Sequence, residues 1–251
     1  MSSRLAFLAA ALLLAVPAAA RAQDCDYDYD DCDEWYVDDY APSSYAGGSF
    51  AIARPQGEFA DYVDGGLGGD LHYIRKLDRN GNVGLRIDGG ILNYGYDHYY
   101  ADDYSGYSAL DVTTTNNIAF IGIGPQIGLP DGRLRPYVNA HVGYSFLWTS
   151  TSVEDRDYYY YDEYYANGDS YTHIDDWSFS YGAGAGLYVP IRNGDQPVSL
   201  DLGVRYHNNG VADYLREGDI VDNQDGTVSL YPVRSDTDLL TYHIGFSIGI
   251  R

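Results

Sequence analysis

Residues Leu240 to Arg251 read Leu-Thr-Tyr-His-Ile-Gly-Phe-Ser-Ile-Gly-Ile-Arg. Side chains alternate between the two faces of a β-strand, so this stretch predicts one apolar face and one small or polar face. The apolar face carries Leu240, Tyr242, Ile244, Phe246, Ile248 and Ile250. The opposite face carries Thr241, His243, Gly245, Ser247, Gly249 and Arg251. Because that face is rich in glycine rather than in lysine and glutamate, it favours a crowded barrel interior over open solvent.

The same alternation recurs seven times upstream. We predict further strands at about residues 48–54, 67–77, 83–91, 119–127, 138–148, 179–189 and 198–207. Short turns are predicted at 78–82, 129–132 and 192–195, and they alternate with long loops such as those at 97–111, 149–176 and 208–236. The Asn80-Gly81 pair in the first turn is a strong hairpin signal. The pattern predicts an all-β fold, a closed antiparallel transmembrane β-barrel of about eight strands.

Strand number and loop lengths together favour one location. An even strand number puts both chain ends and all short turns on one side of a membrane. From Gly48 to Arg251 the chain resembles the small eight-stranded barrels of the bacterial outer-membrane protein β-barrel domain family, which have short periplasmic turns and long surface loops. The resemblance implies a place in the cell outer membrane. It also implies contact with outer-membrane lipid, lipopolysaccharide and the assembly machinery, and we expect a monomer.

The N-terminal segments are expected to lie outside the barrel. Residues 1–22 have a basic start, an apolar run and a small-residue cleavage site, which predicts a signal peptide, with a retained membrane helix as the competing reading. Residues 23–45 form an acidic, tyrosine-rich leader that we expect to be disordered, because it cannot bury enough apolar surface. Cys25 and Cys32 are candidates for a disulfide in an exported protein. The barrel domain is predicted at residues 46–251.

Charge limits the classes of partner. The net charge is -22, from 15 Lys+Arg against 37 Asp+Glu, which argues against nucleic acid and against direct binding of phosphate groups. Tyrosine and acidic residues concentrate in the long loops, for example at residues 99–104 and 158–165. These loops could make surface contacts, bridge lipopolysaccharide phosphates through divalent cations, or form a solvated surface.

Ionisable residues recur on the inward faces of the strands. The predicted charge cluster of the lumen comprises Asp70, His72, Arg86, Asp88, Asp201, Arg205, His207 and His243. Lys76 and His141 share these faces. In a narrow barrel opposite charges can pair across the lumen, so we expect these residues to plug the barrel rather than line a wide pore.

Catalysis has weaker sequence signals. Ser199, Asp201 and His207 share a face, but the serine and the histidine are too far apart along an extended strand to form a hydrogen bond. No cofactor motif or metal-spaced histidine pair is present. We therefore expect a non-enzymatic scaffold that displays its loops for envelope integrity or surface contact. The alternative is a narrow porin-like channel for ions or small solutes, gated by Arg86, Asp88, Asp201 and Arg205.

Overall fold

The computed structural model describes residues 42–102, 108–157, 169–216, 218–222 and 228–250. The predicted signal peptide, most of the leader, Cys25, Cys32 and the tips of the long loops lie outside these ranges.

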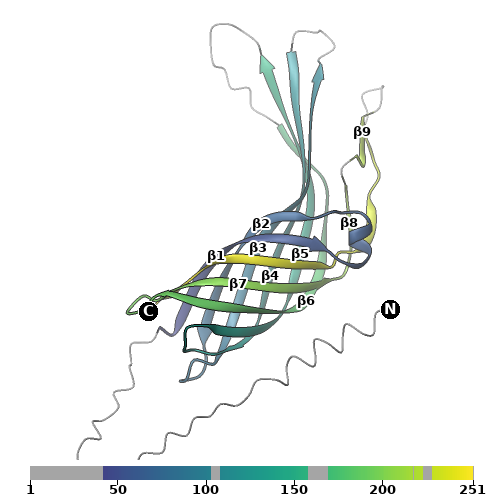
Figure 1. Cartoon of the computed structure of the whole chain (residues 1–251). Helices are drawn as coiled ribbons and strands as arrows, with labels where there is room; N and C mark the ends of the chain where they lie inside the picture. The colour runs from purple at the N-terminus through teal and green to yellow at the C-terminus, as the bar shows by residue number, and fades with distance from the viewer. Residues whose placement is uncertain (1–41, 103–107, 158–168, 217, 223–227, 251) are drawn as a thin grey trace, which may run out of the picture. The chain divides into compact units, whose positions relative to one another are not determined.

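Eight strands close into a barrel with the order β1-β12-β7-β6-β5-β4-β3-β2, and all neighbouring pairs are antiparallel. Figure 1 shows the barrel, and the prediction of a closed eight-stranded antiparallel barrel is confirmed. The barrel strands are β1 (Ser44–Pro55), β2 (Gly66–Lys76), β3 (Val83–Asp102), β4 (Ser108–Gly128), β5 (Arg135–Asp157), β6 (Asp169–Arg192), β7 (Val198–Asn209) and β12 (Leu239–Ile250).

The alternation predicted for the last strand is confirmed. Along β12, Tyr242, Ile244 and Phe246 are about half exposed on the outside. Their neighbours Thr241 and His243 are buried inside. The sequence itself causes this arrangement, because a one-residue slip would turn every apolar side chain inward and every polar one toward lipid.

Aromatic side chains gather on the outer face of β5 and β6. The rings of Phe146 and Trp177 have centroids 4.5 Å apart, and those of Tyr144 and Phe179 are 5.8 Å apart. Trp148 stacks on Phe146 with a centroid distance of 5.4 Å. These residues lie toward the end of the barrel away from the short turns, where an interfacial aromatic belt would be placed.

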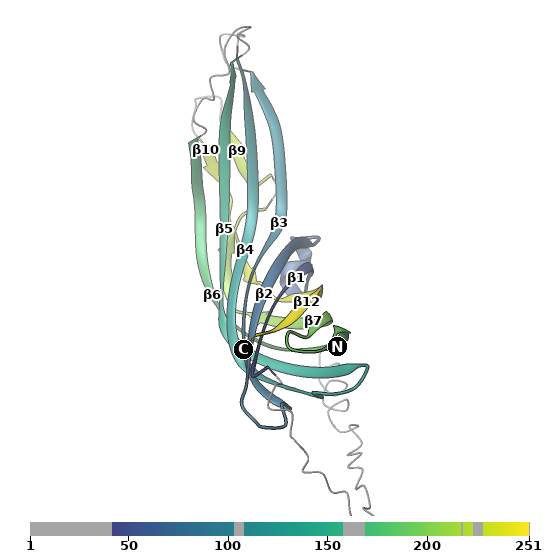
Figure 2. The same ribbon diagram turned by 90° about the vertical axis from the view of Figure 1, so that its left-hand side faces the viewer.

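The predicted long loops at 97–111 and 149–176 are wrong in extent. Strands β3 to β6 contain 20, 21, 23 and 24 residues, whereas β1, β7 and β12 contain 12. About 9–11 residues suffice to cross a membrane, so the four long strands continue past the barrel as one sheet, as Figure 2 shows. Pairing continues to Asp102–Ala109 and Val153–Asp169. The apolar alternation stops where the strands leave the membrane, although their hydrogen-bonded pairing does not.

The remaining connections carry short elements. The predicted loop at 208–236 contains β8 (Val211–Tyr214), β9 (Ile220–Asp222), β10 (Val228–Leu230) and β11 (Val233–Asp236), which pair as β8–β11 and β9–β10. Between β1 and β2 lies a 3-10 turn, η1 (Gly57–Asp61), against which β11 lies. In the described part of the chain no helix is long and apolar enough to span a membrane. We call the parts of β3 to β6 that continue past the barrel the arms. The barrel end with the three short connections is the turn end, and the other is the arm end.

Candidate functional site

Two groups of buried side chains fill the lumen. Nearer the turn end, polar residues converge from five strands. We call this group the polar tier, and it comprises Asp70, His72, Arg86, Asp88, Tyr137, Asp201, Arg205 and His243. Nearer the arm end is the apolar tier, which comprises Ala51, Ala53, Phe59, Val63, Leu92, Tyr94, Ile118, Phe120, Leu147, Ala212, Tyr214 and Leu239.

An ion-pair network around Asp88 crosses the polar tier. Arg86 Nε donates to Asp88 Oδ1 at 2.7 Å, and Arg205 Nη2 donates to the same oxygen at 2.9 Å. Strands β3 and β7 lie on opposite sides of the barrel order, so the Arg205–Asp88 bond spans the lumen. Arg86 Nη1 also donates to Gln126 Oε1 at 3.0 Å and to Tyr188 Oη at 3.1 Å. Each buried cation therefore has an anionic partner, which offsets the cost of removing it from water.

A second network surrounds Asp201. The Tyr137 hydroxyl donates to Asp201 Oδ1 at 2.8 Å and lies 3.1 Å from His243 Nε2. His243 Nε2 is 3.7 Å from Asp201 Oδ1, and His72 Nδ1 is 4.0 Å from Asp201 Oδ2. His72 Nε2 lies 3.3 Å from the Ser247 hydroxyl. Strands β2, β5, β7 and β12 are thereby joined through one carboxylate.

Two members of the predicted charge cluster join neither network. His207 is buried, and its ring lies 4.7 Å from His141 and 5.0 Å from Phe120 between centroids. It therefore lies where the polar and apolar tiers meet. Asp70 is also buried, and its Oδ1 has no hydrogen-bond partner among the described residues. The structure thus brings six of the eight predicted residues into two networks.

Small inward residues make room for these side chains. A Cβ built on Gly203 would lie 2.5 Å from His243 Cε1, and one built on Gly90 would lie 2.5 Å from Phe120 Cζ. Real Cβ atoms do not approach other atoms this closely, so a larger residue would displace the ring. The glycine-rich inner face has a packing role in the filled lumen.

The apolar tier is centred on three aromatic rings. Phe59 from η1 packs edge-on against Tyr94 and Tyr214, with centroids 5.7 and 5.1 Å away. The Tyr94 hydroxyl donates to the Leu215 carbonyl at 3.3 Å, and the Tyr214 hydroxyl lies 2.9 Å from Ser235 Oγ. Burial raises the pKa of Tyr214 in β8 above its ordinary value, so this hydroxyl stays neutral. The elements η1 and β8 thus cover the arm end of the lumen.

Sequence reasoning missed several of these residues. Tyr137 and Gln126 were not assigned to the lumen cluster, although Tyr137 has the same strand parity as the inward Asn139 and His141. The apolar tier was not predicted at all. Its signal is weak, because its residues on the barrel strands are spread over five strands, with one or two inward apolar residues on each.

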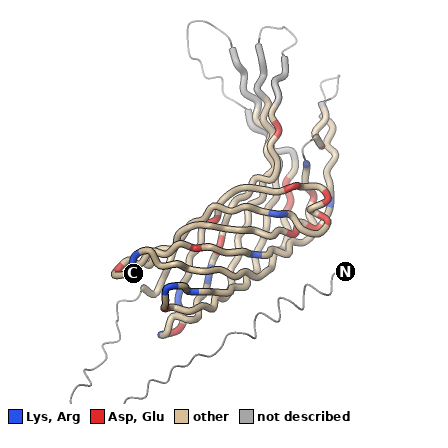
Figure 3. The backbone as a smooth tube through the Cα atoms, in the orientation of Figure 1, with Lys and Arg blue, Asp and Glu red and all other residues tan. Residues whose placement is uncertain are grey.

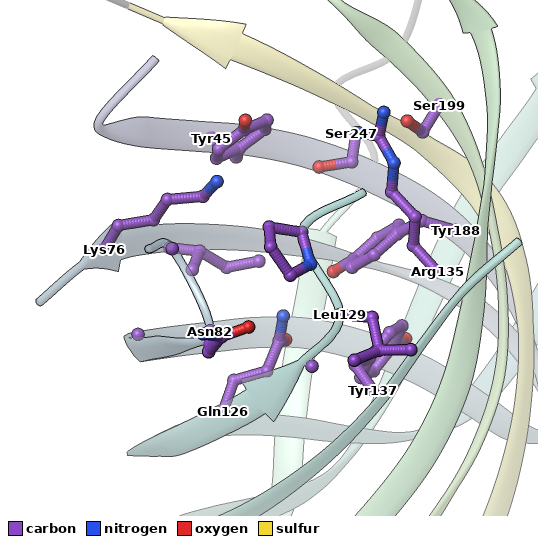
Figure 4. Close-up of a pocket in the computed structure, with 15 residues that line it drawn as sticks. Tyr45, Lys76, Asn82, Gln126, Leu129, Arg135, Tyr137, Tyr188, Ser199 and Ser247 are labelled. Atoms are coloured by element: carbon purple, nitrogen blue, oxygen red, sulfur yellow. The ribbon is translucent and has the colours of Figure 1, made fainter. Parts of the chain in front are cut away.

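The described side chains leave little open space in the lumen. Where the two tiers meet, the gap is too small to hold a water molecule, with a volume of about 0 Å³. It is bounded by Asp88, Phe120, His141, Arg205 and His207. At the turn end a cavity of about 70 Å³ remains, shown in Figure 4. Within the described ranges, no three His, Cys, Asp or Glu side chains converge as metal ligands.

Comparison with known proteins gives one family match. The family described as outer membrane protein beta-barrel domain matches residues 6–231 of the chain. No curated protein matches.

Among solved structures, neisserial surface protein A is 13% identical, with a TM-score of 0.45 and coverage of 84% of this chain and 99% of that one. The attachment invasion locus protein Ail of Yersinia pestis is 12% identical, with a TM-score of 0.43 and coverage of 83% and 98%. OprG from Pseudomonas aeruginosa is 14% identical, with a TM-score of 0.45 and coverage of 83% and 96%.

Proposed function

The chain belongs to the outer membrane protein beta-barrel domain family and is a small bacterial outer-membrane β-barrel protein. We propose that it is a non-enzymatic scaffold for surface contact or envelope integrity. The observation that carries the proposal is the combination of a filled lumen with four strands that run on past the barrel. In such a molecule the barrel anchors the sheet, and the sheet meets the surroundings.

The filled lumen argues against conduction. A permeating ion would have to break the Arg86–Asp88–Arg205 network and then displace the packed rings of the apolar tier. Both steps are costly, since buried charges lose their partners and buried apolar area is exposed. The alternative function, a narrow channel, draws on the polar tier and the cavity at the turn end. The apolar tier stands in the path of any such channel.

The extended sheet, together with the segments that connect its strands, is the candidate contact region. Residues 97–114 and 151–171 hold ten Asp or Glu, one Arg and eleven Tyr. Tyrosine supplies contact area with a hydroxyl that can bond to a partner. The acidic charge favours partners that are cationic, neutral, or bridged by divalent cations such as lipopolysaccharide phosphates. On this proposal the protein is a monomer, and the outer-membrane assembly machinery inserts it.

Shortening the arms tests the contact function. We expect a variant in which an Asn-Gly turn replaces residues 97–114 and residues 151–171 to fold, with heat-modifiable gel mobility, because both tiers remain. Cells carrying it should lose adsorption to a polylysine-coated surface. A variant lacking residues 221–229, which removes the β9–β10 hairpin, is the matched control and should still adsorb. Unchanged adsorption by the arm variant would contradict the proposal.

Sidedness needs its own test, because we propose that the turn end faces the periplasm. An epitope inserted between Asn167 and Gly168 should be labelled on intact cells. One inserted after Asp78 should be labelled only after permeabilisation. The reverse pattern would overturn this orientation.

A further inference from the structure

The cavity at the turn end has the chemistry of an anion site, and we propose that it binds a phosphate group presented from that side of the membrane. Its polar lining includes Lys76, Gln126, Arg135, Tyr137, Tyr188 and Ser199 (Figure 4). Two of these six residues are cations, whereas no Asp or Glu lines the cavity. This site goes beyond the scaffold function and does not depend on whether the arms bind a partner.

The two cations of the cavity are free to meet an anion. The Lys76 ammonium lies 5.0 Å from the centre of the Tyr45 ring, an aromatic contact that leaves its hydrogen-bonding capacity available. Arg135 Nε donates to the Gly132 carbonyl at 3.4 Å, and its terminal nitrogens have no acceptor among the described residues. Unpaired guanidinium nitrogens match the oxygens of a phosphate.

The carboxylate of Asp78, in the turn at 78–82, is occupied by hydrogen bonds within its own turn. Asp78 Oδ1 accepts from the Val83 amide at 2.8 Å, and Asp78 Oδ2 accepts from the Asn82 amide at 3.1 Å. Gly81 has φ +71°, and a Cβ there would lie 2.6 Å from Lys76 Nζ. The absence of a side chain at this position therefore leaves the ammonium its place at the cavity.

The deep wall of the cavity connects to a further cation. Gln126 and Tyr188 line the cavity and accept hydrogen bonds from Arg86. Arg86 is 1% exposed, and its Nη2 has no hydrogen-bond partner among the described residues. Asp88 offsets the charge of Arg86, so the main attraction comes from Lys76 and Arg135, with hydroxyl donors such as Ser199 beside them.

The whole chain has a net charge of -22, but the short connections around the cavity carry more basic than acidic residues. The short connections and their flanks, residues 75–82, 128–135 and 192–197, hold six Lys or Arg and three Asp. In Figure 3 basic and acidic residues both lie at this end, and acidic residues also gather at the arm end. A bilayer core about 30 Å thick separates the two ends, and salt screens exposed charges beyond about 8 Å. Within the described residues, the charge of the short connections beside the cavity is therefore positive.

Phosphate could come from a free phosphate ester or from a phospholipid headgroup of the adjacent leaflet. The test uses the full mature chain in dodecyl maltoside with 150 mM KCl and titrates inorganic phosphate by calorimetry. We expect saturable binding at one site. The double variant Lys76→Gln/Arg135→Gln should weaken it at least tenfold. The double variant Arg79→Gln/Arg133→Gln removes two nearby cations that do not line the cavity, and should change affinity less than twofold.

Two outcomes would overturn the site: the absence of saturable binding in the wild type, or equal weakening in both double variants, which would indicate diffuse attraction to the basic rim. A second experiment distinguishes the two sources of phosphate. Wild-type protein in phosphatidylcholine vesicles is titrated with phosphate, with and without one-fifth phosphatidylglycerol. Competition by phosphatidylglycerol identifies a lipid headgroup as the source, whereas unchanged phosphate binding identifies a free phosphate. Either result supports the phosphate site.

Discussion

The polar and apolar tiers lie in one lumen and share strands β3, β5 and β12, but they are held together by different forces. In the polar tier three carboxylates and two guanidinium groups lie out of water, and two networks bond across the lumen. In the apolar tier aromatic and aliphatic side chains pack without charge beneath η1 and β8. The stability of the polar tier therefore depends on every charged partner being present. The apolar tier depends on buried area and shape, and so tolerates exchanges that conserve volume.

The largest effect should come from breaking the ion-pair network. Asp88→Ala leaves Arg86 and Arg205 buried without their shared carboxylate, and we expect a loss of about 3–5 kcal/mol in the free energy of unfolding. Urea unfolding in lipid vesicles measures it, with Asp131→Ala in the exposed turn as control. The triple variant Arg86→Met/Asp88→Leu/Arg205→Met should recover most of the loss, because no charge is left unpaired. A single variant as stable as wild type would contradict the role of the network.

A somewhat smaller effect is expected in the apolar tier. Leu147 is 1% exposed, so Leu147→Ala should leave a cavity and cost about 2–4 kcal/mol in the same unfolding experiment. Leu147→Met conserves volume and should cost less than about 1.5 kcal/mol. Leu134→Ala, at a residue that is 58% exposed near the turn end, is the control. If Leu147→Met proved as damaging as Leu147→Ala, packing would not be what holds this tier.

The two tiers also differ in how far the sequence predicts them. The sequence predicts that charged residues such as Arg86 and Asp201 point into the lumen. Side chains alternate between the two faces of a strand, and a charge facing lipid is costly. The sequence does not predict which charges pair, because the Arg205–Asp88 pair depends on which strands lie opposite each other once the barrel has closed. The apolar tier depends on single residues that converge only in three dimensions.

The arms were missed for a different reason. The predicted loops began where apolar alternation ends, near Asp97 and Thr149, although strand pairing continues beyond both. In the membrane a strand is recognised by its lipid-facing residues. Beyond Asp97 and Thr149 the regular apolar alternation is absent, so an exposed aromatic residue such as Tyr96 gives only a weak signal of strand.

A smaller cost is expected from crowding the polar tier. The Cβ of Gly203→Ala would lie 2.5 Å from His243 Cε1 and 3.0 Å from the Ala185 carbonyl oxygen, so His243 must move from Tyr137. We expect a loss of about 1–3 kcal/mol in vesicle unfolding. At Gly89 the nearest atom to a Cβ is 3.6 Å away, so Gly89→Ala should be close to neutral. Equal behaviour of the two variants would show that the lumen is looser than described.

The smallest effect should lie at the rim, outside both tiers. The amides of Val83 and Asn82 hold the pKa of Asp78 below its usual value, with Val83 the larger cause. The resulting stabilisation is present above the ordinary pKa of 3.8 and is lost as pH falls through the lower folded value. Asp78→Ala should therefore flatten the acid limb of the stability curve slightly, with no change in its slope near neutral pH. A change confined to neutral pH would contradict this account of the turn.

Planar-bilayer recording tests the sealed lumen most directly. Purified wild-type protein, inserted singly in 1 M KCl, should give no discrete openings at 100 mV of either sign. The Asp88→Ala/Arg205→Ala variant should also stay silent, because Phe59, Tyr94 and Tyr214 still close the arm end. Reproducible single-channel steps from wild type, changed in size or ion selectivity by that double variant, would contradict the scaffold account and establish a channel through the polar tier.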